Sequence, residues 1–106
     1  MTKPYIGLDD MTIQRIIDKL DFVNDSGNII LFGSRAKGNF KNGSDIDIAI
    51  KSNDLDFHQL MRIKSKLEEL DLPYKIDLID YNTIENEELR NHIDRVGIQF
   101  KNQGSI

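Results

Sequence analysis

Two aspartates, Asp45 and Asp47, lie two residues apart in the segment SDIDIAI, and carboxylates in this spacing are suited to binding a cation. In a β-strand, residues two apart project from the same face, so both carboxylates would share one surface. Neighbouring like charges on a strand repel each other unless water or a cation neutralises them. Mg²⁺ binds carboxylate oxygens, often together with substrate phosphates. Taken alone, the pair is also compatible with an ordinary solvated face of a sheet.

A third carboxylate would complete a site for two metal ions, which clamp the attacking and leaving oxygens of a displacement when about 3.5–4 Å apart. The segment YKIDLID offers Asp77 and Asp80. Ile76 and Leu78 form the inward pair of this strand, so Asp77 lies on its opposite face. Asp80 falls on the other face or past the end of the strand. We therefore predict Asp77 as the third acid.

A glycine-rich loop, GSRAKG, directly follows the apolar segment NIILF. Gly33 and Gly38 have the spacing of a Walker A loop, but Asn39 and Phe40 stand where that motif needs Lys and Ser or Thr. A P-loop NTPase is thereby excluded. Glycine still lets the backbone approach an anion, and the hydroxyl of Ser34 with the first amides of a helix can bind phosphate. On its own, the loop favours the simpler interpretation, a strand-to-helix turn with Ser34 as N-cap.

The elements that must position these residues alternate along the chain. Apolar periodicity and capping residues predict helices from Asp9 or Asp10 to Val23, from Phe57 to Leu70, and from a cap at Asn82 and Glu85 to about Val96, with Gly97 just past the end. Strands are predicted at 28–32, 45–50 and 74–79, with a short edge strand at 98–100. GSRAKG adds a short helix. This order predicts an α/β (α+β) fold, in which a small mixed sheet is flanked by helices.

Composition bounds the function. The 106 residues predict a single domain, residues 1–106, and the net charge of −4 argues against direct nucleic-acid binding by a broad basic face. Cysteine is absent, which excludes disulfides and thiolate metal sites. The apolar runs are too short to span a membrane, and the N-terminus has no signal-peptide core. We expect a cytoplasmic protein with no membrane association.

GSRAKG followed by SDIDIAI resembles the nucleotidyltransferase fold of the DNA polymerase beta superfamily, whose pattern is a Gly-Ser turn, a short spacer and Asp-x-Asp. The resemblance covers nearly the whole chain, from the first helix to the last. The short length is similar to that of the minimal nucleotidyltransferases. This resemblance implies a nucleotidyltransferase that moves a nucleoside monophosphate, expected to be AMP from ATP, to a hydroxyl.

The resemblance also implies a role for each candidate residue. Three loop residues would bind the phosphates of the nucleotide: Gly33, Ser34 and Arg35. Three acids would be catalytic and would hold two Mg²⁺ ions: Asp45, Asp47 and Asp77. Of these, Asp77 would sit beside the acceptor hydroxyl and help its deprotonation.

Minimal members of the family imply a partner. They pair with a helical HEPN-type protein as a toxin–antitoxin system, in which the nucleotidyltransferase is the antitoxin and transfers AMP to a tyrosine of the toxin. The acidic balance of the chain agrees with a protein acceptor. An alternative stays open: a non-catalytic, nucleotide-binding module that neutralises its partner by direct contact. A D-x-D glycosyltransferase is discarded, because its sugar-nucleotide domain needs a longer chain.

Several remaining residues have plainer interpretations. His58 and His92 lie among charged residues, and we expect both to be surface histidines. Tyr74 and Tyr81 flank the third strand and are expected to pack at its ends. The segment GIQFKN is compatible with an edge strand used for partner pairing, which the sequence does not decide.

Overall fold

The computed structural model describes residues 6–20 and 27–100. In chain order its elements are α1 (Asp10–Lys19), β1 (Gly27–Phe32), α3 (Gly33–Lys37), β2 (Ile46–Ser52), α4 (Phe57–Glu68), β3 (Ile76–Asp80), the 3₁₀ turn η1 (Tyr81–Thr83), α5 (Glu87–Val96) and β4 (Ile98–Gln99). The strands form one sheet in the order β3-β2-β1-β4. β2 runs parallel to β3 and antiparallel to β1, which in turn is antiparallel to β4. The mixed sheet flanked by helices is the predicted fold.

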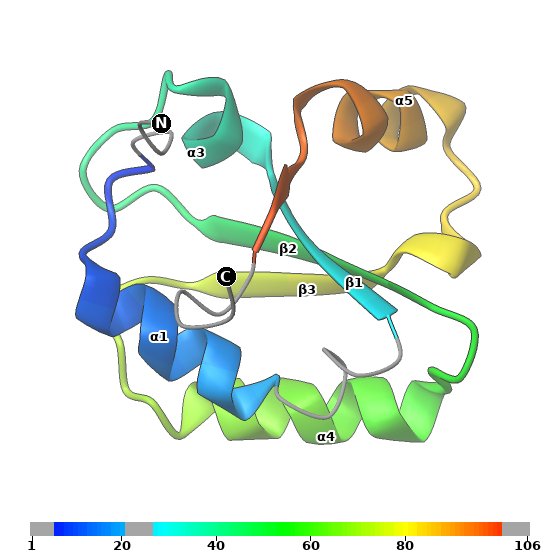
Figure 1. The fold of residues 1–106 in the computed structure, drawn as a ribbon, viewed down its shortest axis with the longest axis horizontal. Helices are drawn as coiled ribbons and strands as arrows, with labels where there is room; N and C mark the ends of the chain where they lie inside the picture. Colours follow the sequence, from blue (N-terminus) through cyan, green and yellow to red (C-terminus); the bar gives the residue numbers. More distant parts are fainter. Residues whose placement is uncertain (1–5, 21–26, 101–106) are drawn as a thin grey trace.

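The main core lies between the sheet and the pair of helices α1 and α4, which are drawn below the sheet in Figure 1. Strict alternation in β2 turns Ile46, Ile48 and Ile50 to this side, and all three are fully buried. Ile16 and Ile17 of α1 face them from the helix layer. Burial of this apolar surface is the main force that fixes which face of β2 turns inward, and Asp47 consequently lies on the other face.

The opposite face of the sheet, where α3 and α5 lie (Figure 1), carries a smaller core. Ala49 of β2 and Ile93 of α5 are buried in it, with Ile79 of β3 partly buried against them. Asp47 and Asp77 lie on the same face of the sheet. They precede Ala49 and Ile79 by two residues on β2 and β3, respectively. The acids therefore lie at the edge of a packed core rather than on a fully solvated face.

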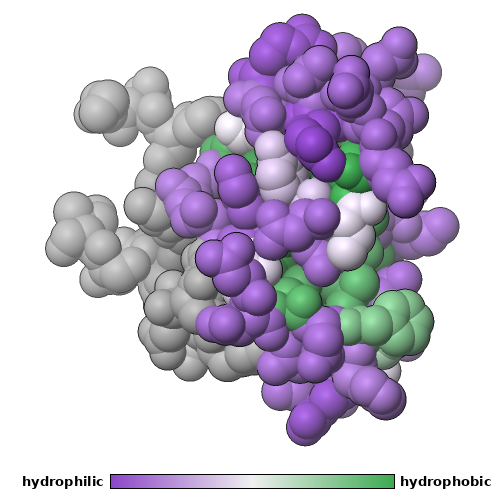
Figure 2. All heavy atoms as spheres, turned by 90° about the vertical axis from the view of Figure 1, so that its right-hand side faces the viewer, coloured by the Kyte–Doolittle hydropathy of each residue, from purple (hydrophilic) through white to green (hydrophobic). Residues whose placement is uncertain are grey.

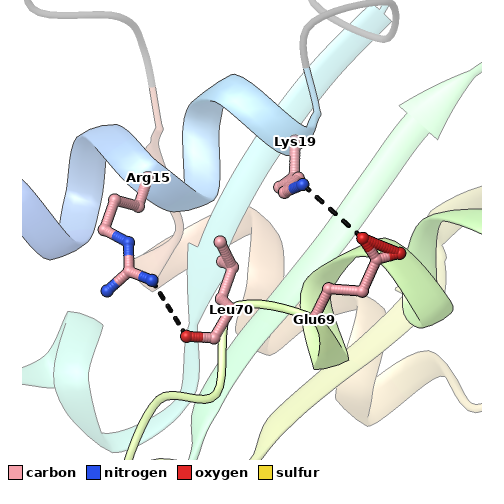
Figure 3. A network of polar contacts seen from close by, with 4 residues as sticks. All are labelled: Arg15, Lys19, Glu69 and Leu70. Atoms are coloured by element: carbon pink, nitrogen blue, oxygen red, sulfur yellow. Dashed lines mark hydrogen bonds and ion pairs between the residues drawn. The ribbon is translucent and has the colours of Figure 1, made fainter.

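Polar contacts tie α1 to the end of α4 (Figure 3). The guanidinium of Arg15 donates from Nη2 to the carbonyl oxygen of Leu70 at 2.9 Å, and Lys19 Nζ lies 3.9 Å from a carboxylate oxygen of Glu69. The helix pair is thus held together both by apolar packing and by side chains at its rim.

Most element boundaries agree with the sequence prediction. Asp9 caps α1 by accepting a hydrogen bond from Thr12 N at 2.7 Å, and Gly97 ends α5. The predicted cap of the last helix was wrong, because Asn86 caps α5, whereas Asn82 lies in η1 and donates to the carbonyl oxygen of Ser52.

Two further predicted boundaries have different outcomes. Ser34 is not the N-cap of α3, since that position is Phe32 and no side chain caps the helix. The predicted extension of the first helix to Val23 lies outside the described residues.

The described surface is largely polar. Figure 2 shows one end of the molecule, where hydrophilic residues cover most of the view and apolar groups gather in its lower half. Among the described residues, Met11 and Phe57 are the large apolar side chains that are well exposed, at 74% and 71%. Single exposed apolar residues are common in folded proteins and need no partner to explain them. No helix in the described part of the chain is long and apolar enough to cross a membrane.

Candidate active site

The structure brings the predicted acids of β2 and β3 together. Asp47 and Asp77 are directly opposite each other in the parallel register of the two strands, and both side chains leave the same face of the sheet. Adjacent strands lie about 4.8 Å apart, so the two carboxylates are close neighbours. Asp45 directly precedes β2 and is exposed, two residues before Asp47.

Asp47 carries the electrostatic strain of this arrangement. Its pKa is raised to about 6, first by burial, then by the charges of Asp77 and Asp45, and by a hydrogen bond with Asp77. A nearby cation would reverse the effect, because it favours the charged carboxylate. Lys75 supplies a partial counter-charge, with its Nζ 3.7 Å from Asp77 Oδ1. The raised pKa of Asp47 thus indicates that a cation bound beside this carboxylate would be stabilised.

Gly33 lies against Asp47. The antiparallel register pairs Phe32 with Asp47, so the chain enters α3 directly beside this carboxylate. Gly33 has a φ of +77°, and a Cβ atom on it would lie 2.2 Å from Asp47 Oδ2. Only glycine fits here, because any side chain would displace the carboxylate or strain the backbone. The loop backbone and the acids therefore form one site.

His92 also belongs to this site, contrary to its prediction as a plain surface histidine. It is half-buried on α5, and its Nε2 accepts a hydrogen bond from the backbone N–H of Gly33 at 3.1 Å. Its ring packs edge-on against Phe32, with ring centroids 6.2 Å apart. Fifty-nine residues separate His92 from Gly33, and no motif links the two, so the sequence carried no signal for this contact.

Arg35 does not lie where a phosphate-binding residue would, which corrects its prediction. Its side chain is only 2% exposed. The guanidinium donates to the carbonyl oxygens of Ser44 at 2.9 and 3.2 Å, of Ile6 at 2.9 Å and of Gly7 at 3.3 Å. It also stacks on two aromatic rings, those of Phe40 and Tyr74, at 5.2 and 4.9 Å from the centroids.

The contacts of Arg35 give it a positional role. Ser44 directly precedes Asp45, so the guanidinium fixes the backbone that leads into the acidic strand. Tyr74 packs as predicted, here against this cation, and Tyr81 is buried with its hydroxyl donating to Asp94 at 2.8 Å. Ser34 is half-buried at the second position of α3.

The acids of the site differ from a preformed metal site in their arrangement but match one in their chemistry. Within residues 6–20 and 27–100, no three His, Cys, Asp or Glu side chains are arranged to hold one ion together. Carboxylates without a cation repel one another, and Asp77 is paired with Lys75 in this arrangement. Their chemistry nevertheless fits Mg²⁺, since two facing carboxylates, one with a raised pKa, are oxygen ligands in need of positive charge.

Comparison with known proteins decides the family. Residues 12–104 match the family described as Polymerase beta, Nucleotidyltransferase. The chain belongs to this family. The matched residues include the glycine loop, Asp45, Asp47 and Asp77, and the family agrees with the mixed sheet and flanking helices described above.

Individual relatives of this chain are similar to it over different lengths. A protein of Haemophilus influenzae named "Probable protein adenylyltransferase MntA" is 46% identical over 66 residues, which cover 61% of this chain and 57% of that relative. The aligned segment therefore spans little more than half the length of this curated relative.

Two solved structures share the fold. A chain in the crystal structure of a toxin–antitoxin with AMP-PNP is 29% identical, with a TM-score of 0.66, covering 87% of this chain and 74% of that one. A chain in the structure of a tri-AMPylated Shewanella oneidensis HEPN toxin in complex with MNT antitoxin is 27% identical, with a TM-score of 0.65, covering 89% and 72%.

Proposed function

We propose that this chain is a Mg²⁺-dependent nucleotidyltransferase that transfers AMP from ATP to a hydroxyl of a partner protein. The observation that carries the proposal is the facing pair of Asp47 and Asp77, with the backbone of Gly33 against Asp47. In this arrangement the backbone of Gly33 would bind phosphates, and the two facing carboxylates would bind divalent cations. Membership of the nucleotidyltransferase family supports the same activity.

The proposed reaction is a displacement at the α-phosphorus. The acceptor hydroxyl gives up its proton with the help of Asp77, its oxygen forms a bond to this phosphorus, the bond to the β-phosphate oxygen breaks, and pyrophosphate leaves. Bound Mg²⁺ would neutralise phosphate charge and favour the deprotonated acceptor. The chain's own residues divide the remaining work: Gly33 and Ser34 hold the phosphates, Asp45 and Asp47 bind the metal, and Asp77 binds metal and orients the acceptor hydroxyl.

The partner is proposed to be a HEPN-type toxin, with one of its tyrosines as acceptor, in the cytoplasm. The solved relatives support this, because one is a complex of an AMPylated HEPN toxin with its antitoxin and another is a toxin–antitoxin with AMP-PNP. The chain would then act as an antitoxin by modifying the toxin.

The test is the intact mass of the protein encoded by the neighbouring gene, measured after it is co-expressed with this chain. The control is the same co-expression with Asp45→Asn and Asp47→Asn combined. A gain of one or more AMP masses with the natural chain, absent with the double variant, is the expected result. No gain in either case would overturn the transferase proposal.

A second candidate is a nucleotide-binding module that neutralises its partner by contact alone. It is favoured by one observation, the lack of a three-donor metal arrangement among the described side chains. The double variant separates the two candidates, because a contact antitoxin without its metal-binding acids would still suppress toxicity in growing cells.

A further inference from the structure

A groove of about 330 Å³ lies between α4 and the beginning of β3, and Asp77 is one of the residues that line it. Its apolar lining combines the buried Leu67 and Leu78 with the half-buried Leu72, Tyr74 and Ile76. A cavity of this size accommodates one or two side chains of a ligand. Asp77 thus belongs both to the acidic pair and to the strand segment that lines the groove.

Strand β3 is an end strand of the sheet formed by the described residues. Ile46 N donates to the carbonyl oxygen of Lys75 at 2.8 Å, which sets the hydrogen-bonding phase of the parallel pair. The N–H and C=O groups of successive residues in a strand point alternately to its two sides. Those of Ile76 and Leu78 therefore point to the outer edge, away from β2. No described strand pairs with that edge. Within the described part of the chain, the outward amides and carbonyls of this edge have no partner and lie beside an apolar groove, an arrangement that binds extended peptides by strand addition.

The order of groups across the site indicates from which side an acceptor enters. Gly33 lies on the β1 side of Asp47, and Asp77 lies on the other side of it, on β3. Attacking and leaving oxygens are roughly in line in phosphoryl-type transfers. With the phosphates on the Gly33 side, the acceptor oxygen approaches from the outer edge of β3, where the groove lies.

We infer that this groove receives an extended segment of the acceptor protein, which adds to β3 as a further strand and presents its hydroxyl at Asp77. The inference rests on the proposed transferase function. A residue paired opposite Asp77 places its side chain on the acidic face, and its two neighbours turn toward α4. The segment is therefore expected to carry apolar residues on both sides of the modified one, filling the groove beside Leu67 and Leu72.

The first test removes one outward amide. Proline lacks the N–H and is tolerated at strand edges, so Ile76→Pro deletes a strand-addition donor without breaking the β2–β3 ladder. Gln99→Pro is the matched control, since it places a proline in β4 at the other edge of the sheet. With the protein encoded by the neighbouring gene as probe, I76P is expected to lower its affinity and AMP transfer to it at least tenfold, and Q99P to leave both near the natural value. Equal transfer by I76P and the natural chain would overturn the inference.

A second comparison separates this inference from the proposed function. D45N/D47N keeps the groove and is expected to bind the partner without modifying it, whereas I76P keeps the acids and is expected to retain the thermal shift produced by Mg²⁺ and ATP. Partner modification lost by D45N/D47N but kept by I76P would uphold the transferase and reject strand addition. Absence of transfer by the natural chain would reject the transferase proposal. The partner affinities of I76P and Q99P would then still test the groove.

A third measurement covers the case in which I76P does not fold. Leu72→Trp fills the groove from a half-exposed position, with Met11→Trp as the control at an exposed site on α1. L72W is expected to weaken partner binding at least tenfold and M11W to leave it unchanged. In the natural complex, the amides of Ile76 and Leu78 should become protected from hydrogen exchange. Unprotected amides in the complex, or protection that rises with the concentration of this chain alone, would overturn the inference.

Discussion

At the scale of single residues, the contact between Gly33 and Asp47 is the tightest constraint on the site. A methyl group on Gly33 would meet Asp47 Oδ2, whereas one on Gly38, which also has a positive φ, would meet nothing within 4 Å. Gly33→Ala is therefore expected to destabilise the protein by about 3 kcal/mol, from backbone strain plus overpacking, and Gly38→Ala by about 1 kcal/mol, from strain alone.

Urea unfolding of the two alanine variants measures this difference, and the thermal shift caused by Mg²⁺ and ATP shows whether the acids have moved. Only G33A should lose the shift. Equal stability losses in G33A and G38A would show that the side chain of Asp47 moves away from the added methyl group at no cost in stability.

Asp47 gives a prediction about pH. Its pKa in the folded protein, about 6, lies above the ordinary value of 3.8, so the folded state holds the extra proton between these values. Without metal, the carboxyl consequently lowers stability as pH rises through this window, and the full penalty is present above about pH 6. Asp47→Asn removes the penalty and is expected to be more stable than the natural chain at about pH 8 in EDTA, with the advantage vanishing near pH 4.

Thermal unfolding across this pH range, with and without Mg²⁺, tests the expectation. Mg²⁺ should raise the melting temperature of the natural chain and leave that of D47N unchanged. Asp54→Asn, at an exposed turn beyond the other end of β2, serves as the control. A D47N protein less stable than the natural chain at about pH 8 in EDTA would contradict the electrostatic account.

At the scale of elements, α5 holds the start of α3 through His92. Replacing His92 by Phe keeps a ring against Phe32 but leaves the Gly33 N–H without its acceptor, at a cost of about 1 kcal/mol. His92→Gln keeps an acceptor oxygen. H92F is expected to bind Mg²⁺–ATP several-fold more weakly than H92Q, as titration calorimetry would measure. Tighter binding by H92F would instead show that His92 competes with the nucleotide for this amide.

The sequence predicted the elements and the faces of the acids because both follow from local rules. Alternation in SDIDIAI and YKIDLID is a two-residue pattern, so it assigns Asp47 and Asp77 to one face without knowledge of the fold. The roles of His92 and Arg35 could not be predicted in this way. Each depends on a contact with backbone atoms far along the chain, and such contacts leave no period or motif in the sequence.

At the scale of the whole molecule, Arg35 joins segments that are distant in sequence. Its contacts reach the carbonyl of Ile6, the carbonyl of Ser44 and the ring of Tyr74, so one buried cation connects the chain before α1 with the approaches to β2 and β3. That residues 1–106 form a single domain stays a prediction. If the chain unfolds as one unit, replacing Arg35 should lower the free energy of unfolding of the whole chain.

Arg35→Lys tests the connection. Lysine cannot reproduce the planar fork of donors, so buried carbonyls lose partners, and we expect a loss of about 2–3 kcal/mol in the free energy of unfolding. Lys37→Ala, at an exposed position of the same helix, should change it by less than about 0.5 kcal/mol. Urea unfolding followed by circular dichroism measures both. An R35K protein as stable as K37A would show that the carbonyls find other partners.

The buried guanidinium also sets a limit for protein engineering. Residues 33–50 contain the glycine loop and two of the acids, and they look like a cassette that a designer would move into another sheet. Their shape, however, depends on the carbonyl of Ile6, which lies 29 positions before Arg35, and on the ring of Tyr74, far beyond the cassette. Transplanted alone, the segment would keep the carbonyl of Ser44 as an acceptor, but Nη1 of its buried guanidinium would lose the carbonyl acceptors before α1. A working graft would have to bring those two distant supports along, or replace Arg35 by an apolar side chain that needs neither.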